Sequence, residues 1–233
     1  MAKRIISQAR GHGSGTYRVR RAAFKYRLQY PPKLQGEGTV VSLLSSAGHT
    51  APIAKIRYNE GIFFIPAFKG MVEGQTINLD SKEVKEGNII KLESVPIKTN
   101  IYSIEASPGD GGIFIKTGGS SAYVNRTLGE KVYVMMPSKQ EKEFNKNCRA
   151  IIGVIAGEGR LDKPFMKAGT KHHLMLARGK LYPRTSAIKV NVIDHPFGSG
   201  RGKNPKRKTA KRDAPPGKRV GHIRPSRTGR KKR

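Results

Sequence analysis

The two ends of this 233-residue chain carry most of its charge and few aliphatic side chains. Residues 1–35 hold nine Lys and Arg residues and no acidic residue, and residues 199–233 hold fifteen Lys and Arg residues and one acid, Asp213. Together they supply 23 of the 30 net positive charges. Such segments bury too little apolar surface to offset the entropy of ordering them. The chain is therefore expected to fold in its middle, between two basic irregular extensions.

A formal net charge of +30 restricts the class of protein. This charge repels itself unless a polyanion neutralises it, which indicates a nucleic-acid partner. The single cysteine, Cys148, excludes an internal disulfide framework and a cysteine-rich zinc site. The N-terminal sequence lacks the apolar core of a signal peptide, and no apolar run approaches the roughly 20 residues of a membrane span. We therefore expect a cytoplasmic protein with no membrane partner.

Aromatic side chains distinguish the first extension from the second. Tyr17, Phe24, Tyr26 and Tyr30 alternate with arginines, a pattern suited to unpaired bases and sugar-phosphate. A solvated linker is the alternative interpretation. The predicted RNA contacts in the first extension are Arg4, Arg10, Arg18, Arg20 and Arg21, and those in the second are Arg201, Lys206, Arg207, Lys208, Lys211, Arg212, Lys218 and Arg219.

The middle of the chain reads as β-structure. Residues 36–93 contain five short segments rich in β-branched and aromatic residues, which predict a five-stranded barrel of the oligonucleotide-binding type. This region holds six basic and seven acidic residues, a net charge of −1, so the barrel is not itself a basic patch. The expected strands are 37–44, 51–58, 61–66, 76–79 and 88–92.

A second set of strands follows within residues 94–175. Glycine-rich connections such as 108–112 separate them, which favours a second small barrel; one larger sandwich is the alternative. The expected strands are 100–105, 113–117, 121–126, 131–136 and 149–155. The predicted organisation is therefore an extension over 1–35, barrels over 36–93 and 94–175, and an extension over 176–233.

No catalytic or phosphate-binding motif of known spacing occurs in the sequence. Asp194-His195 has catalytic character, because an Asp can orient or charge an adjacent imidazole, but no serine or cysteine nucleophile accompanies it. A turn capped by the Asp side chain explains the pair equally well. Two adjacent histidines, His172 and His173, do not share a helix face, so hydrogen bonding to RNA or stacking on it is favoured over metal binding. No catalytic residue and no metal site are predicted.

Several motifs resemble one known family. The segment 157–164 followed by Lys167-Ala168-Gly169, the turn 194–198 and the tail segment 212–221 resemble the large-subunit ribosomal protein two family in its archaeal and eukaryotic form. Residues 36–41, 51–56, 107–110, 147–150 and 227–230 fall in the family's order too, so the likeness covers nearly the whole chain.

The resemblance implies both architecture and site residues. It implies an oligonucleotide-binding barrel followed by a Src-homology-3-like barrel, with both extensions threaded into large-subunit ribosomal RNA. By position Lys25, Arg27 and Arg149 match family residues that contact RNA, and Lys163 lies in a matching motif. Asp194 and His195 match the family's pair near the peptidyl-transferase centre. The chain departs from the family at 184–193, where a glycine and a proline are missing, and in the triplet 198–200.

The resulting hypothesis is a structural, non-enzymatic RNA-binding protein of the large ribosomal subunit. Its role would be to support subunit association and the peptidyl-transferase region. The expected partners are large-subunit ribosomal RNA, neighbouring ribosomal proteins and small-subunit RNA at the subunit interface. The chain needs no cofactor of its own, and structural Mg²⁺ would be bound by the RNA. A histone-like compacting protein is the alternative, and the run 203–212 also suits a nuclear-import signal.

Overall fold

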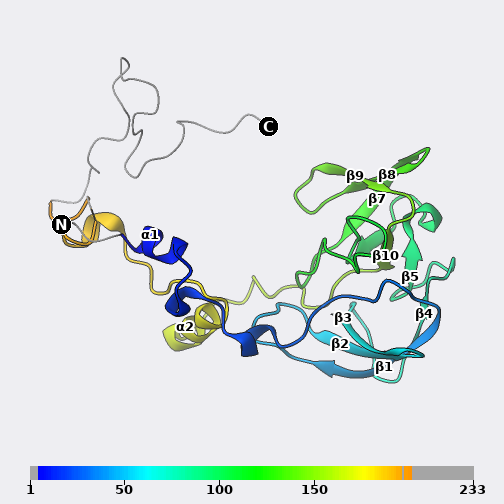
Figure 1. Cartoon of the computed structure of the whole chain (residues 1–233), viewed down its shortest axis with the longest axis horizontal. Coiled ribbons are helices and arrows are strands. Elements are labelled where there is room, and N and C mark those ends of the chain that lie inside the picture. Colours follow the sequence, from blue (N-terminus) through cyan, green and yellow to red (C-terminus); the bar gives the residue numbers. More distant parts are fainter. Residues whose placement is uncertain (1–4, 196, 201–233) are drawn as a thin grey trace, which may run out of the picture. The chain divides into compact units, whose positions relative to one another are not determined.

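A computed structural model describes residues 5–195 and 197–200 of the chain. By their contacts the described residues form two units, one running over Val19–Arg178 and the other combining residues 5–18 with the described residues from Gly179 onward. All ten strands belong to the first unit (Figure 1). The domain boundaries at residues 35, 93 and 175 stay predictions.

The first group of strands matches the predicted positions closely. Strands β1, β2 and β3 are antiparallel neighbours, and Asn59 and Glu60 make a two-residue connection between the second and third. A short parallel contact between Leu79 and Ile89 joins the last two strands of the group. The bounds are Gly36–Leu44 for β1, Ile53–Tyr58 for β2, Gly61–Pro66 for β3, Thr76–Leu79 for β4 and Ile89–Lys91 for β5.

The second group differs from the prediction in two places. The expected strand over 113–117 is wrong: these residues form a loop with one isolated bridge, Ile104 to Phe114. A strand that was not predicted, β9, lies at the end of the sheet order. The strands are β6 Asn100–Tyr102, β7 Ala122–Leu128, β8 Lys131–Met135, β9 Glu141–Asn145 and β10 Arg149–Ile152.

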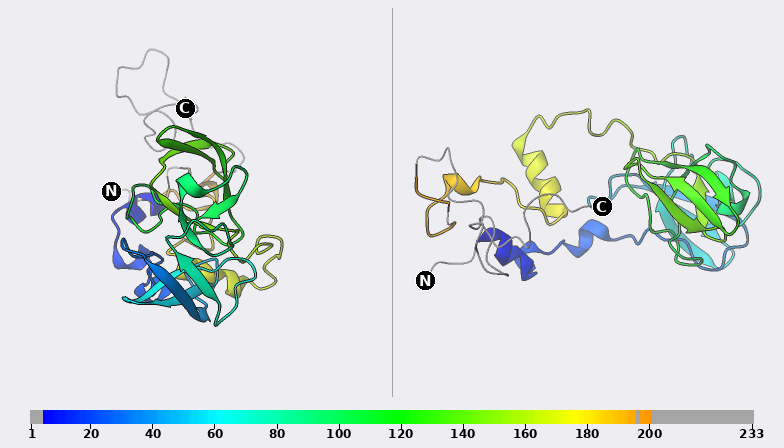
Figure 2. Two further views of the ribbon diagram at one scale, coloured as in Figure 1. Left: turned by 90° about the vertical axis from the view of Figure 1, so that its right-hand side faces the viewer. Right: turned by 90° about the horizontal axis from the view of Figure 1, so that it is seen from above.

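Strands β5 and β10 form a common wall between two hydrophobic cores. They pair antiparallel, and successive residues of a strand point to opposite faces. Ile89 and Ile151 accordingly enter the core of the first group, while Ile90 and Ile152 enter the core of the second. The sheet order is β3-β2-β1-β4-β5-β10-β6-β7-β8-β9, and Figure 2 shows the strands from two further directions. The predicted fold class, an oligonucleotide-binding barrel followed by a Src-homology-3-like barrel, is confirmed.

Helices are short. Helix α1 is Ile6–Gly11 and helix α2 is Ala168–Ala177. Neither helix was predicted: α1 lies in the extension expected to be irregular, and α2 in the region expected to be a barrel. Single 3₁₀ turns occupy Gly15–Tyr17, Arg21–Phe24, Leu92–Ser94 and Ala187–Lys189. Within residues 5–195 and 197–200, no helix combines the length and the apolar character needed to cross a bilayer.

The second half of the predicted N-terminal extension is part of the folded body. Ala23, Leu28, Tyr30 and Leu34 are buried, and Leu28 forms a bridge with Phe64 of β3. The Tyr30 hydroxyl lies 3.0 Å from two carbonyl oxygens far away in sequence, those of Ser103 and Arg149, which share its single proton. This tyrosine is therefore a core residue and not a surface for bases. The segment that approaches the barrels therefore has a fixed path, from which the remaining side chains project.

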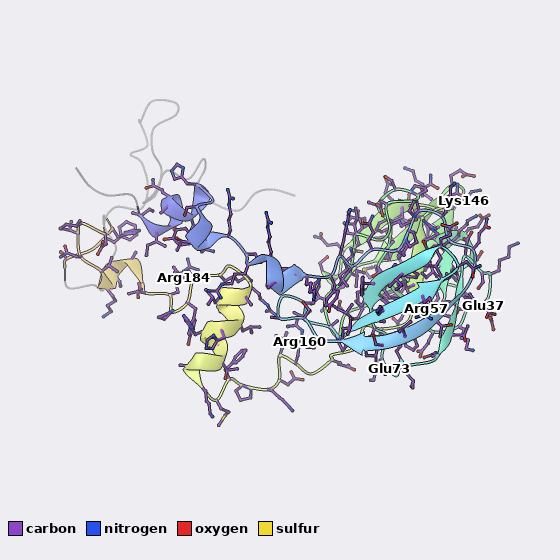
Figure 3. All side chains as sticks on the ribbon, turned by 60° about the horizontal axis from the view of Figure 1, so that its bottom comes forward. Glu37, Arg57, Glu73, Lys146, Arg160 and Arg184 are labelled. Carbon is purple, nitrogen blue, oxygen red and sulfur yellow. The ribbon has the colours of Figure 1, made fainter. Side chains whose placement is uncertain are left out.

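The outer surface of the first barrel carries both signs of charge. Glu37, Arg57 and Glu73 are all exposed, and Figure 3 shows them on the outside of the strands. This mixture agrees with the net charge of −1 over residues 36–93. A basic face is therefore not a general property of the barrel, and it has to come from the segments that pack on it.

Candidate nucleic-acid interface

A row of exposed cations runs along the segment that enters the barrels. The 3₁₀ turn Arg21–Phe24 buries only Ala23, so its other side chains project outward. Arg20, Arg21, Lys25 and Arg27, all of which were predicted as RNA contacts, are exposed. Phe24 is 46% exposed among them, an unusual position for a large aromatic side chain. These four cations and one aromatic ring form what we call the entry segment.

The loop after β1 is fastened to the entry segment by its backbone. The Gly48 amide and the Ser46 hydroxyl both donate to the Ala23 carbonyl, at 2.8 and 2.9 Å. A Cβ on Gly48 would overlap that carbonyl and the Phe24 ring, so only glycine permits the approach. The contact sets the His49 ring edge-on to Phe24, with 4.9 Å between ring centroids.

A second loop forms the opposite side of this surface. The Asp110 carboxylate accepts hydrogen bonds from the amides of Ala106, Ser107 and Gly112 at 2.7–3.0 Å, an arrangement that holds the loop in a tight turn. The Asp110 carbonyl in turn accepts from the Gln29 amide nitrogen at 2.7 Å. The loop is thereby tied to the chain just after the entry segment, and none of the entry-segment cations is used for this contact.

The two loops and the entry segment border an open pocket of about 680 Å³. Its walls include Phe24, Arg27, His49, Asp110 and Lys116. The Lys116 ammonium donates to the Leu28 carbonyl at 2.6 Å, and desolvation by burial lowers its pKa. The pKa of His49 is also lowered, first by burial and then by the charge of Lys116, so its imidazole is neutral near pH 7. The pocket thus combines aromatic rings with a retained positive charge.

Arg149, predicted to contact RNA, occupies a different environment. Its Nη2 donates to Glu105 Oε1 at 2.8 Å, and the side chains of the pair are 8% and 0% exposed. Its guanidinium lies 5.3 Å from the ring centroid of Tyr30. The neighbouring Cys148 is buried, and burial raises the pKa of its thiol, as expected for a packing residue. The described geometry gives Arg149 a place in the core, and its RNA contact stays a prediction.

The Asp194-His195 segment is a compact turn. The amides of Asp194 and His195 both approach the Asn191 carbonyl, and the Ser199 hydroxyl accepts from the Val192 amide at 3.1 Å. His195 Nδ1 accepts a hydrogen bond from the Phe197 amide at 3.2 Å, so the neutral ring carries its proton on Nε2. This leaves an N–H donor on a half-buried ring. The turn uses the side chains of Asn191 and Ser199, which the sequence analysis did not single out.

The other predicted contacts are dispersed. Arg10 donates to the Gly179 carbonyl and Arg18 to the Gly13 carbonyl, while Lys163 is exposed. His172 and His173 are exposed on α2 with ring centroids 5.5 Å apart. In the described part of the chain, no three His, Cys, Asp or Glu side chains cluster as metal ligands. Outside the described residues lie Arg4, Arg201, Lys206, Arg207, Lys208, Lys211, Arg212, Lys218 and Arg219.

Two pocket residues, His49 and Lys116, were missed by the sequence analysis. Neither stands in a charge run or a motif, and they lie 67 positions apart on loops of different barrels. The sequence holds only an indirect indication of this pocket, the glycines Gly48 and Gly112. A side chain at either position would overlap the residues packed around the pocket.

A mainly β fold of two small barrels, bordered by exposed cations and an exposed ring, is typical of proteins that bind nucleic acid. Residues 85–215 match the family described as Ribosomal Proteins L2, C-terminal domain. The chain is 45% identical to the large ribosomal subunit protein uL2 of Methanococcoides burtonii, over 99% of this chain and 100% of the relative.

Two further relatives extend the comparison. The uL2 proteins of Methanocaldococcus jannaschii and Archaeoglobus fulgidus are 41% and 40% identical to the chain, covering 100% and 98% of it and 100% and 99% of the relatives. The similarity therefore runs through both extensions as well as the barrels. The chain belongs to the ribosomal protein L2 family.

Proposed function

We propose that this chain is a structural component of the large ribosomal subunit that binds ribosomal RNA through its extensions and entry segment. The proposed role is architectural and not enzymatic. Cations of the extensions would act as counterions where RNA helices approach one another, and the barrels would fix where each extension enters the RNA. Neighbouring ribosomal proteins, and small-subunit RNA at the subunit interface, are further proposed partners. The proposed location is the cytoplasm, within the ribosome.

The observation that carries this proposal, beside the family, is the placement of four exposed cations on one fixed segment. Arg20, Arg21, Lys25 and Arg27 are exposed beside a ring that is itself half exposed. Ion pairing within the extension does not explain their clustering, because residues 1–35 contain no acidic residue. Each phosphate that such a group neutralises releases condensed counterions, so affinity depends on salt.

The test replaces the four cations of the entry segment with glutamine in the full-length chain. Binding to large-subunit ribosomal RNA is measured over a range of KCl concentrations. If all four contact phosphate, the slope of log affinity against log salt becomes about three to four units shallower. The matched control replaces four exposed lysines of the barrels, Lys82, Lys85, Lys91 and Lys98, and should leave the slope unchanged. Equal slopes for both variants and the unmodified chain would refute the proposed contact surface.

The alternative function, general nucleic-acid compaction, makes a different prediction. A histone-like protein binds duplex DNA and ribosomal RNA with similar affinity at matched salt, because phosphate contacts carry no sequence information. A ribosomal protein with a fixed, shaped surface should prefer folded ribosomal RNA. Competition between the two nucleic acids, with the full-length chain, distinguishes the functions.

The proposal also includes the turn at Asp194 and His195. Its Nε2–H donor suits a positioning contact to RNA, which we propose lies near the peptidyl-transferase centre by family resemblance. Ribosomes carrying His195→Ala should then assemble and form peptide bonds more slowly, while His195→Gln, which keeps a donor, should recover part of the rate. Normal rates with both variants would remove this role.

A further inference from the structure

We propose that the pocket beside the entry segment holds a single unpaired nucleotide of the RNA, with its base against Phe24 and His49 and its phosphate near Lys116. The inference rests on the proposed RNA-binding function and deepens it. The chain would then have a site that binds an extruded base, in addition to the cations that neutralise the phosphates of the RNA backbone.

The first argument is the volume of the pocket and the kind of side chain that lines it. A volume of about 680 Å³ falls within the roughly 300–1,000 Å³ of small-molecule sites. Phe24 is 46% exposed although it is a large hydrophobic residue, and the His49 ring stands edge-on beside it at 4.9 Å. Aromatic faces next to a basic groove are the usual platform for an unstacked base. Two aromatic rings at the surface of a pocket fit a flat ligand.

The second argument is the hydrogen-bonding state of His49. The Ser46 hydroxyl donates its proton to the Ala23 carbonyl at 2.9 Å, so its oxygen receives the hydrogen bond from His49 Nδ1, also at 2.9 Å. The proton therefore sits on Nδ1 and leaves Nε2 as an acceptor. Burial and Lys116 lower the pKa of this imidazole and keep it neutral. A neutral acceptor beside a ring suits the exocyclic amino group of adenine, guanine or cytosine.

The third argument is a positive charge that the fold keeps partly buried. Lys116 is half-buried, and among the described residues its ammonium makes one hydrogen bond, to the Leu28 carbonyl. An ammonium has three donors, so two of them remain for a ligand. Among the described residues that line the pocket, Asp110 is the only acid, and its carboxylate accepts hydrogen bonds from three loop amides. Arg27 adds a second cation at the rim, and together the two favour a phosphate.

The fourth argument is that the pocket is preformed. The carbonyl of Ala23 receives two hydrogen bonds from the loop that carries His49, and Gln29 holds the opposite loop through the Asp110 carbonyl. Fixed walls lower the entropy cost of binding a small group. A nucleotide is the occupant that uses the rings, the acceptor and the cation at once, and a peptide side chain does not.

The test uses two RNA hairpins of the same length, one fully paired and one with a single bulged 2-aminopurine, with the full-length chain. The bulged hairpin should bind about tenfold more tightly, with the fluorescence of its 2-aminopurine altered on binding. Phe24→Ala and Lys116→Met should each remove most of that preference and leave affinity for the paired hairpin nearly unchanged. The controls are Tyr123→Ala, an aromatic 39% exposed on β7, and Lys82→Met, an exposed lysine outside the pocket.

The possible failures are distinguishable. If the chain binds both hairpins equally, with ordinary salt dependence and no fluorescence change, the pocket proposal is wrong and RNA binding stands. If it binds neither hairpin, nor ribosomal RNA, the proposed function itself fails. If Phe24→Ala reduces the affinity for both hairpins alike, the ring contributes to contacts with the RNA backbone and does not bind an unpaired base. Circular dichroism of each variant confirms that it is folded.

Discussion

Breaking the buried ion pair between Glu105 and Arg149 should lower the free energy of unfolding much more than breaking an ion pair on the surface. Glu105 is completely buried and its carboxylate accepts from the Arg149 guanidinium, the Arg149 amide and the amides of Gly109 and Gly111, at 2.8–3.4 Å. Arg149→Met removes the guanidinium but keeps the three amides. Leaving one member of a buried pair uncompensated costs about 3–5 kcal/mol, and the remaining amides favour the lower end, about 3 kcal/mol.

Glu105→Ala should cost more than Arg149→Met. It leaves the Arg149 cation without a partner and the three amides without an acceptor. Each amide that is left buried and unsatisfied lowers the free energy of unfolding by about 1 kcal/mol or more. The loss should reach about 5 kcal/mol. The double variant should lose less than the sum of the single variants, because the two residues share one interaction. This order distinguishes a carboxylate that organises the loop from a simple pair of charges.

The assay is urea unfolding of the full-length chain followed by circular dichroism. At a slope of about 2 kcal/mol per M, a loss of about 3 kcal/mol moves the midpoint by about 1.5 M. The control Arg126→Met breaks the pair with Glu141, whose side chains are 53% and 28% exposed, and should shift the midpoint little. The effect of Arg149→Met should also persist in 1 M salt, because buried pairs are weakly screened. Midpoints of Arg149→Met and Arg126→Met that coincide would refute the reasoning.

Three further predictions concern neighbouring residues. Ser103→Ala should leave the free energy of unfolding unchanged or raise it by about 1 kcal/mol in the same urea assay, since Ser103 Oγ is buried without a partner among the described residues. Gly48→Ala should cost about 1–3 kcal/mol there, because its Cβ would overlap the Ala23 carbonyl and the Phe24 ring. The folded pKa of His49 lies below its unfolded value, so stability should fall as pH drops through about 6.5, and midpoints of His49→Gln should vary less over that range.

Much of the β-structure could be predicted from local pattern. Each of the first five strands overlaps a segment predicted from β-branched and aromatic residues. The strand expected at 113–117 failed because two glycines with positive φ, Gly111 and Gly112, lead into a loop that bridges only once. Strand β9 escaped notice because it lies at a sheet end and buries only Phe144, so its sequence looks like a charged loop.

The site was less predictable, because long-range contacts decide which aromatic rings are free. Phe24 and Tyr30 stand in the same basic segment and carry the same local signal. Tyr30 is buried because its hydroxyl reaches the carbonyls of Ser103 and Arg149, 73 and 119 residues away. Phe24 has no such partner in the core and stays half exposed beside His49. The hydroxyl distinguishes Tyr30 from Phe24, but the distant carbonyls that it contacts cannot be read from residues 1–35.

The charges and the pocket should affect RNA binding through different measurements. Arg149 is one of the 46 Lys and Arg residues, but its guanidinium pairs with Glu105 in the core. The net charge therefore overstates the number of cations that can contact phosphate. Exposed cations such as Arg20 set the number of counterions released, which is the salt slope. Stacking on Phe24 releases no counterion. Phe24→Ala should therefore lower affinity for a bulged RNA by the same factor at every salt concentration, whereas Arg20→Gln should lower it most at low salt. A change of slope in Phe24→Ala would show that the ring orders the cations instead of holding a base.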